Sequence, residues 1–248
     1  MNDLEEAKMQ TPIEIALGVD ENGMTTASKL YSFLELNPSN YSKWCKTREI
    51  CMLLIEDKGQ KEGQHILKNR YFDSNDIEVL RAPLPVGDYV IAEETVLDVI
   101  RRKSARKMEV KKMDFIGSYK VAVDTKKDMQ EITGNVCGKQ HPRFRDECIL
   151  AQNNNIALYV LVENMDGIKT IEDVFHWHNP RLERYNKIKY MHGIGKWLNV
   201  PLPKAPPTSG EVLGKAMLTM QLKYGVEFVF CRPEDAGSRV IELLELEK

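Results

Sequence analysis

Two short patterns in the sequence bring together the acidic and basic residues that phosphodiester hydrolysis needs. Gly87-Asp88-Tyr89 comes directly before an apolar stretch, and Asp124-Thr125-Lys126 comes directly after one. Alternate residues of an extended strand point to the same side, so Asp124 and Lys126 are predicted to face one site. Carboxylates hold Mg²⁺ or Mn²⁺, and a neighbouring lysine orients water and stabilises the charge that grows on phosphate. These residues predict a metal-dependent nuclease; because Asp-x-Lys is a common pattern, a surface salt bridge at a strand end stays open as the alternative.

The elements that must position these residues alternate between strand and helix. Apolar runs predict strands at 52–55, 77–82, 89–91, 121–123, 157–162 and 226–231. The segments between them predict helices at 65–73, 128–135, 143–152, 210–223 and 233–246, with Ser209 as an N-cap and Pro233 in a first turn. This alternation predicts an α/β fold, with a central mixed sheet flanked by helices.

The chain is predicted to have a small helical segment, residues 1–50, followed by one large domain, residues 51–248. Helices are expected at 26–36 and 41–50, separated by a turn at Asn37-Pro38, and the composition changes near Cys51. Two segments of the large domain interrupt its alternation and are interpreted as insertions. One is basic, at 92–119, and the other, at 176–208, ends in a Pro-rich linker.

Composition excludes several classes of protein. The net charge of -2 leaves nucleic-acid binding open, because clustering of Lys and Arg matters more than their total. Five cysteines without a C-x-x-C pair argue against a zinc ribbon and a disulfide framework. The sequence has no apolar leader and no run long enough to span a bilayer, which predicts a soluble protein that does not enter membranes.

The basic insertion contains a sequence that imitates a nuclease strand. Arg101 stands two residues before Lys103, where a metal-binding acid would be required, and a guanidinium cannot ligate a metal. The segment 101–112 is therefore expected to be a helix or loop whose cations contact phosphates, namely Arg101, Arg102, Lys103, Arg106 and Lys107. A solvated charged face is the alternative.

Three weaker patterns favour structure over chemistry. His176-Trp177-His178 has no third ligand nearby, so packing or a DNA contact is favoured over a metal site. The sequence from Gly193 to Lys196 is too short for a phosphate-binding loop and is expected to be a turn. Cys137, with His141 four residues later, offers only a weak case for a thiol protease.

The central motifs resemble a known family. The runs LPVGDYVI, at 84–91, and VDTKKD, at 123–128, resemble the nuclease domain of the XPF-type structure-specific endonucleases of the PD-(D/E)XK superfamily. Compact bacteriophage versions are closer still, through DTKKDMQEITGNVCGKQHPRFRDECILAQ, YVLVEN and KYGVEFVFCRPEDAGSRVIELLE. The resemblance covers about residues 52 to 248 and implies a restriction-endonuclease-like fold.

Position by position, the resemblance implies a role for each matching residue. Asp88 and Asp124 would ligate Mg²⁺ or Mn²⁺ with Lys126 catalytic, and Asp57 matches the acid that opens the family pattern. Asp128 and Glu163 would support them, and Arg143 and Arg145 fall in the helix that faces the phosphate backbone. The chain departs from the pattern at Lys58-Gly59-Gln60, where the family has Arg-Glu, in having Asp-Thr-Lys for Glu-Arg-Lys, and in the long spacing from Asp88 to Asp124.

The resemblance implies an endonuclease that cuts branched or flap DNA during phage replication or recombination, in the cytoplasm of a bacterial host. It also allows a homodimer. Residues 20–48 resemble the start of the phage AntA/AntB antirepressor domain, which implies a phage or host protein as a further partner of residues 1–50. The alternative is a catalytically silent, DNA- or protein-binding phage regulator on a nuclease-like scaffold.

Overall fold

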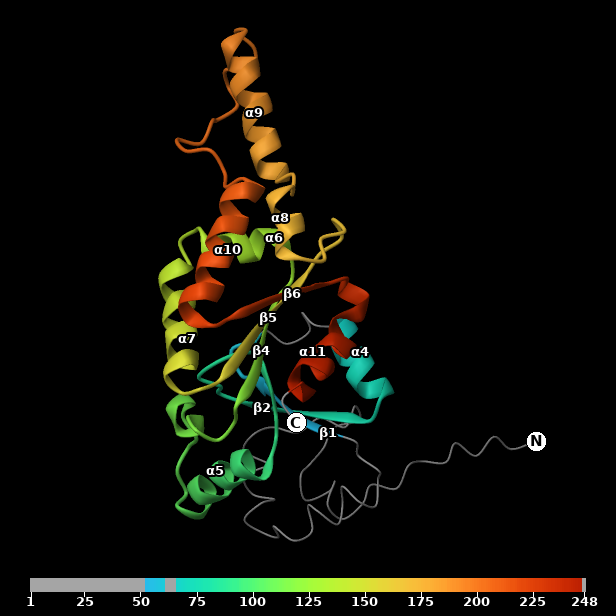
Figure 1. Ribbon diagram of the computed structural model, residues 1–248, viewed down its shortest axis with the longest axis vertical. Helices are drawn as coiled ribbons and strands as arrows, with labels where there is room; N and C mark the ends of the chain where they lie inside the picture. Colours follow the sequence, from blue (N-terminus) through green and yellow to red (C-terminus); the bar gives the residue numbers. More distant parts are fainter. Residues whose placement is uncertain (1–51, 61–65, 247–248) are drawn as a thin grey trace, which may run out of the picture. The chain divides into compact units, whose positions relative to one another are not determined.

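The chain forms two compact units, Met1–Lys120 and Val121–Lys248. The computed structural model describes residues 52–60 and 66–246. Among these described residues each unit combines three strands with helices, which confirms the predicted α/β class (Figure 1). The division at Lys120 falls inside the segment that the sequence assigned to one large domain. The helices predicted in the first fifty residues, and the boundary near Cys51, lie outside the described residues.

The first unit is built around strand β1 (Met52–Asp57). Strand β2 (Ile77–Ala82) pairs with β1 in parallel, and β3 (Tyr89–Ile91) pairs with it antiparallel, so the strands of this unit are mixed as predicted. The connection from β1 to β2 contains helix α4 (Ile66–Ser74), whose Phe72 meets the ring of Tyr89 edge-on at 5.8 Å between centroids. Both rings are fully buried, which places the core of this unit beside the end of β1.

A tight turn before β3 positions Asp88. Gly87 has φ of 74°, a left-handed conformation that a residue with a side chain adopts at a cost. The turn is held by the buried hydroxyl of Tyr119, which donates to the carbonyl of Val86 at 3.0 Å and accepts from its amide at 3.3 Å. Helix α5 (Glu94–Ala105) and the 3₁₀ turn η1 (Lys112–Phe115) follow β3. The segment 101–112 is thus a helix end and a loop, as predicted, and contains no strand.

The second unit contains three parallel strands in the order β4 (Val121–Lys126), β5 (Ala157–Glu163) and β6 (Glu227–Cys231). Every residue of β5 after the first is buried, which explains its uninterrupted apolar sequence. Helices α6 (Met129–Val136), α7 (His141–Asn153) and α10 (Gly210–Tyr224) lie on one side of these strands in Figure 1, and α11 (Ala236–Glu245) lies on the other.

The ends of these helices follow local rules only in part. Ser209 caps α10, accepting from the amide of Val212 at 3.3 Å, as the sequence predicts. The helix ends at Gly225, whose φ of 68° is typical of a glycine C-cap. The last helix begins later than expected, because Pro233–Asp235 forms the 3₁₀ turn η2 and α11 starts at Ala236.

The segment 176–208, predicted as an insertion with a linker, contains a long helix. A short helix α8 (Ile171–Phe175) precedes it, and α9 (Pro180–Gly193) extends beyond the strands of its unit (Figure 1). Asn179, which is buried, joins the two ends of this excursion. Its Nδ2 donates to the carbonyl of Thr208 at 2.7 Å, while its Oδ1 accepts from the amide of Arg181 and from Gln130.

No helix in the described part of the chain is both long and apolar enough to cross a membrane.

Candidate active site

Asp124 and Lys126 form a buried ion pair on one face of β4. The Nζ atom of Lys126 lies 2.6 Å from Oδ1 of Asp124, to which it donates, and 2.6 Å from Oδ2. Only 4% of the Asp124 side chain and 10% of the Lys126 side chain is exposed. The prediction that the two residues face the same side is therefore confirmed, and the pair is a salt bridge at a strand end that is buried and does not lie on the surface.

Helix α7 covers this pair with apolar side chains. Lys126 Nζ lies 5.6 Å from the centre of the Phe144 ring, a distance at which a cation is attracted to the ring. One turn further along the helix, burial raises the pKa of the Cys148 thiol to about 12, and the negative charges of Glu147 and Asp124 act in the same direction. The surroundings strengthen the attraction between Asp124 and Lys126, because little water is present to screen it.

The two residues predicted to support the pair have different positions. Asp128 caps α6, its Oδ1 accepting from the amide of Glu131 at 2.7 Å, so it fixes the chain two residues after Lys126. Glu163 is buried at the end of β5. In the parallel register Lys126 is opposite Val162, so Glu163, one residue later, belongs to the other face of the strands.

In the first unit, Asp57 and Asp88 lie side by side at the end of β1. The amide of Asp57 donates to the carbonyl of Asp88 at 2.7 Å, and both residues are buried. Asp57 Oδ1 accepts from the amide of Leu84 at 2.9 Å, and Oδ2 lies 3.4 Å from Nζ of Lys112. Lys112, which sequence patterns did not single out, is 55 residues from Asp57 in the chain.

Glu56 adds a third acid to this end of β1, and the sequence analysis did not count it among the site residues. Its Oε1 accepts from the hydroxyl of Tyr89 at 2.9 Å, and its Oε2 lies 3.2 Å from Nε of Arg81. Burial raises the pKa of Glu56; Tyr89 and Arg81 oppose the rise, and the charge of Asp88 adds to it. The sequence signal that could have found Glu56 is its place beside Asp57, where the apolar run of β1 ends in two acids.

The donors present suit a hard divalent cation by type. Mg²⁺ and Mn²⁺ prefer carboxylate oxygens, and Mg²⁺ commonly keeps several waters while taking one or two carboxylates from the protein. Asp57 with Asp88 in the first unit, and Asp124 in the second, offer such oxygens. Within residues 52–60 and 66–246, however, no group of three or more His, Cys, Asp or Glu side chains is arranged as ligands of one metal ion.

Of the cations in the basic insertion that are predicted to contact DNA, two bind neighbouring acids and three are exposed. Arg101 donates to Asp98 and Glu94 on its own helix, and Lys103 lies 2.7 Å from Asp114, whose pKa this contact lowers. The remaining predicted DNA contacts are exposed: Arg102, Arg106 and Lys107. The exposed cations thus cluster at the end of α5.

The two arginines predicted on α7 differ in the same way. Arg143 is exposed near the start of the helix. Arg145 is bound by Asp146, with Nη2 2.8 Å from a carboxylate oxygen, and this contact raises the pKa of the guanidinium. Both arginines lie on the helix that carries Phe144 over Lys126.

The structure favours structural roles for the three weaker patterns, namely the His-Trp-His run, the cysteine with its histidine, and the Gly193–Lys196 turn. Trp177 is buried and donates from Nε1 to Asp166 at 2.9 Å, while His178 is exposed. Burial raises the pKa of Cys137, which opposes the thiolate that a protease would need. The stretch from Gly193 to Lys196 forms the turn that ends α9, as predicted.

Comparison with known proteins adds no family. No protein-family model matches the sequence, and no curated protein is similar to it at a significant level. The assignment of function depends on the residues themselves.

Proposed function

We propose that the protein is a Mg²⁺- or Mn²⁺-dependent endonuclease that hydrolyses phosphodiester bonds of DNA, at branched, flap or junction structures in phage replication or recombination. The observation that supports this most is the Asp124–Lys126 pair. An acid and a lysine two residues apart are buried together, at the end of a parallel strand and directly before a capped helix. Water-excluded charges of this kind are costly to fold, which favours a use for them.

The proposed roles follow from the chemistry of each side chain. Asp124 in the second unit, and Asp88 and Asp57 in the first, are the proposed metal ligands; a bound metal would lower the pKa of a water and neutralise charge on the phosphate. Lys126 carries a cation that would orient the attacking water and stabilise the phosphorane-like charge as the P–O bond breaks. The Phe144 ring covers one side of the Lys126 ammonium at 5.6 Å, which limits the screening of its charge by bulk solvent.

The pair also suggests how the buried carboxylates would be stabilised in the absence of a metal ion. A buried carboxylate without a partner is unstable, and Lys126 supplies that partner at 2.6 Å. In the first unit, the amide of Leu84 and the ammonium of Lys112 do the same for Asp57. Asp124 and Asp57 therefore each have an internal cation or donor that a metal ion would compete with or displace.

The test is cleavage of labelled DNA by the purified full chain with Mg²⁺ or Mn²⁺. Linear duplex, single-stranded, nicked, flap and forked substrates are compared, using Asp88→Asn and Asp124→Asn, which keep side-chain shape. Each substitution is expected to lower the rate by about 100-fold or more. If both acids serve one reaction, the double variant is no slower than either single one. Glu242→Gln, an exposed acid on α11, is the matched control.

Metal binding is measured separately by thermal unfolding. Mn²⁺ is expected to raise the Tm of the parent and of Glu242→Gln, and to lose that effect in Asp88→Asn and Asp124→Asn. Failure of the parent to cut any substrate, or an Asp124→Asn protein that cuts as fast as the parent, would contradict the proposal. DNA binding without cleavage under any metal would favour the silent regulator instead.

A further inference from the structure

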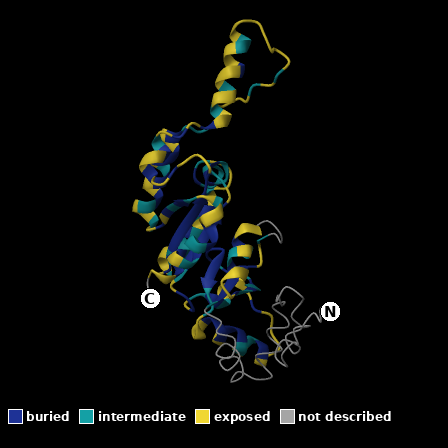
Figure 2. Ribbon diagram, turned by 90° about the vertical axis from the view of Figure 1, so that its right-hand side faces the viewer, coloured by how far each residue is buried: buried dark blue, intermediate teal, exposed yellow. Residues whose placement is uncertain are grey.

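Residues 180–208 form an arm, made of α9 and the segment that returns along it to Thr208. Asn179 closes the base of the arm through its bond to Thr208 at 2.7 Å. About two thirds of the residues of the arm are exposed, and only Ile188 of the arm is buried (Figure 2). An exposed excursion of this length is a cost unless it contacts something outside the protein.

The charge of the arm is opposite to that of the chain as a whole. The whole chain carries -2, whereas the arm has a single acid, Glu183. It contains six cations: Arg181, Arg184, Lys187, Lys189, Lys196 and Lys204. Such segregation of positive charge favours a polyanionic partner, because each phosphate contact releases condensed counterions.

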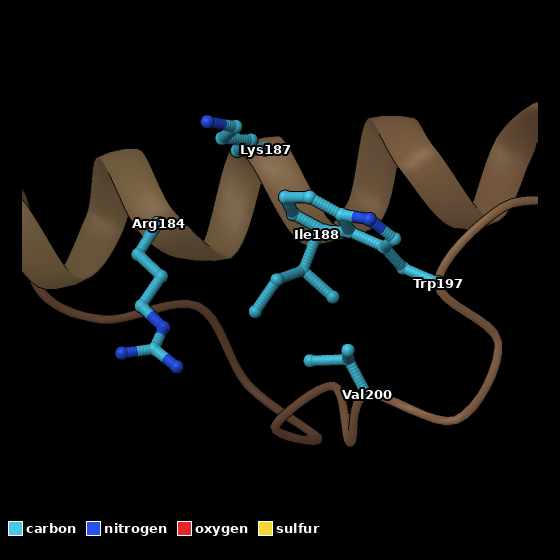
Figure 3. Close-up of a pocket in the computed structure, with 5 residues that line it drawn as sticks. All are labelled: Arg184, Lys187, Ile188, Trp197 and Val200. Atoms are coloured by element: carbon cyan, nitrogen blue, oxygen red, sulfur yellow. The ribbon is translucent and has the colours of Figure 1, made fainter.

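Between α9 and the return segment lies a hollow of about 350 Å³. Figure 3 shows Ile188 and Val200 facing each other, with the indole of Trp197 at one end and the guanidinium of Arg184 at the other. Lys187 Nζ lies 5.6 Å from the centre of the Trp197 ring. The hollow thus combines a flat aromatic wall, an apolar floor and two cations.

Trp197 is held in an uncommon backbone conformation. Its φ is 52°, in the left-handed region that bulky residues rarely adopt. Its carbonyl accepts from the amide of Val200 at 2.8 Å and lies 2.8 Å from Nε2 of His192. The residue is nevertheless 42% exposed, so this strained turn places a tryptophan in contact with solvent.

We propose that the arm binds single-stranded nucleic acid, with a base in the hollow against Trp197 and the flanking phosphates on Arg184 and Lys187. A base has the flat apolar face that the indole and the Ile188–Val200 floor accept, and its phosphates match the cations. In a duplex the base faces are stacked and covered, so the hollow selects an unpaired strand. Resting on the proposed function, this assigns to the arm the unpaired strand of a DNA junction.

Binding is measured by fluorescence anisotropy of labelled oligothymidylate in EDTA, where no cleavage interferes. Trp197→Ala is expected to weaken binding by roughly 5- to 150-fold, as for loss of one stacked base, and Trp197→Phe by much less. Arg184→Gln and Lys187→Gln should each reduce the slope of log K against log salt by about 0.7. Lys223→Gln, an exposed lysine on α10, is the matched control and should leave the slope unchanged apart from weak long-range effects.

Tryptophan fluorescence separates stacking from simple attraction of charge. Oligothymidylate is expected to quench the parent, and Trp197→Phe should lose that quenching while it still binds. Trp197→Phe keeps Trp44 and the buried Trp177, which is hydrogen-bonded to Asp166, and the emission of these two residues is the reference. Variants are compared by thermal unfolding, so that a fold defect is recognised; Trp197→Phe then decides the outcome, because it keeps an aromatic ring in place.

Competitors identify the ligand. Equal competition by oligouridylate would support the site and extend it to single strands of RNA. Equal competition by a duplex, binding of anionic lipid vesicles in preference to the oligonucleotide, or a folded Trp197→Ala protein that binds as tightly as the parent would overturn the inference. These results do not depend on cleavage, so an arm that fails and a nuclease that fails are told apart.

Discussion

The ammonium of Lys126 and the carboxylate of Asp124 lie 2.6 Å apart in a part of the second unit where almost no surface of either side chain is exposed. An ion pair in such a place contributes little net stability, because desolvation of both groups offsets their attraction. Its effect becomes visible when one partner is removed, since the other charge is then buried without compensation.

Lys126→Met is therefore expected to lower the free energy of unfolding by about 3–5 kcal/mol. The double variant Asp124→Asn with Lys126→Met should lose less than the two single variants together. Urea unfolding without metal measures both. Lys215→Met, which breaks an exposed pair with Glu211, is the control and should have a much smaller effect on the free energy of unfolding. Equal costs for Lys126→Met and Lys215→Met would contradict a buried pair.

Glu56 gives a prediction about pH. Because burial raises its pKa, the folded state holds this proton more tightly than the unfolded chain does. Stability from this group is complete below the unfolded value of 4.5 and is lost as pH rises through the raised pKa. The glutamine side chain of Glu56→Gln cannot titrate but can still accept from Tyr89. Between pH 4.5 and the raised pKa, the free energy of unfolding of this variant should therefore rise relative to that of the parent. Above the raised pKa, the difference between the two should stay constant.

Stability of the two proteins is compared by urea unfolding in EDTA across that pH range. Glu211→Gln is a control of opposite sign, because Lys215 lowers the pKa of Glu211. As pH falls through the lowered pKa, protonation of Glu211 costs the parent stability, and Glu211→Gln does not show this loss. If the variant Glu56→Gln instead lost stability relative to the parent as pH rises, the folded protein would favour the ionised form of Glu56, which contradicts the prediction.

Cys148 should be inert in the folded protein. Its thiol is buried, and a pKa of about 12 leaves almost no thiolate at neutral pH. Iodoacetamide at about pH 8 is expected to modify the partly exposed Cys231 much faster than Cys148, and urea should remove the difference. Peptide mass spectrometry follows each site. Similar rates in the native protein would mean that α7 opens readily over Asp124 and Lys126.

The contact between α10 and α8 depends on the absence of a side chain at Gly210. A Cβ there would stand 2.6 Å from the carbonyl oxygen of Trp177 and collide with that of Val174, both fixed backbone atoms. Gly210→Ala should cost about 1–3 kcal/mol of unfolding free energy. Gly134→Ala, in α6 with no atom within 4 Å of the new methyl, is expected to stabilise by about 0.5–1 kcal/mol. The same sign for both would contradict the close packing.

The strands and the Asp124–Lys126 pair could be predicted because local signals carry them. A run of apolar residues ending in a charged one specifies β4, and a period of two specifies the common face. Strand boundaries elsewhere agree to within a residue or two for the same reason. The helix α9 was missed, since its apolar residues are few and only one of its positions, Ile188, is buried.

Relationships between distant residues could not be predicted from local patterns. The contact of Lys112 with Asp57 and the hydrogen bonds of Asn179 depend on how the chain folds back, and no residue spacing in the sequence predicts them. Glu163 shows the limit most clearly: its type and its place at a strand end were read correctly, but the pairing of Lys126 with Val162 puts it on the other face. Register, which is a property of two strands, decided its orientation.

The bond between Asn179 and Thr208 has a consequence for how this protein can change. Because this bond holds the two ends of the arm together, the arm is a closed loop inserted in the connection from β5 to β6, and its ends keep the same separation for any length of the arm. The entropy of closing a loop grows only with the logarithm of its length. Insertions or deletions within the excursion therefore leave the assembly of the strands almost untouched, and the protein's reach can be altered independently of its core.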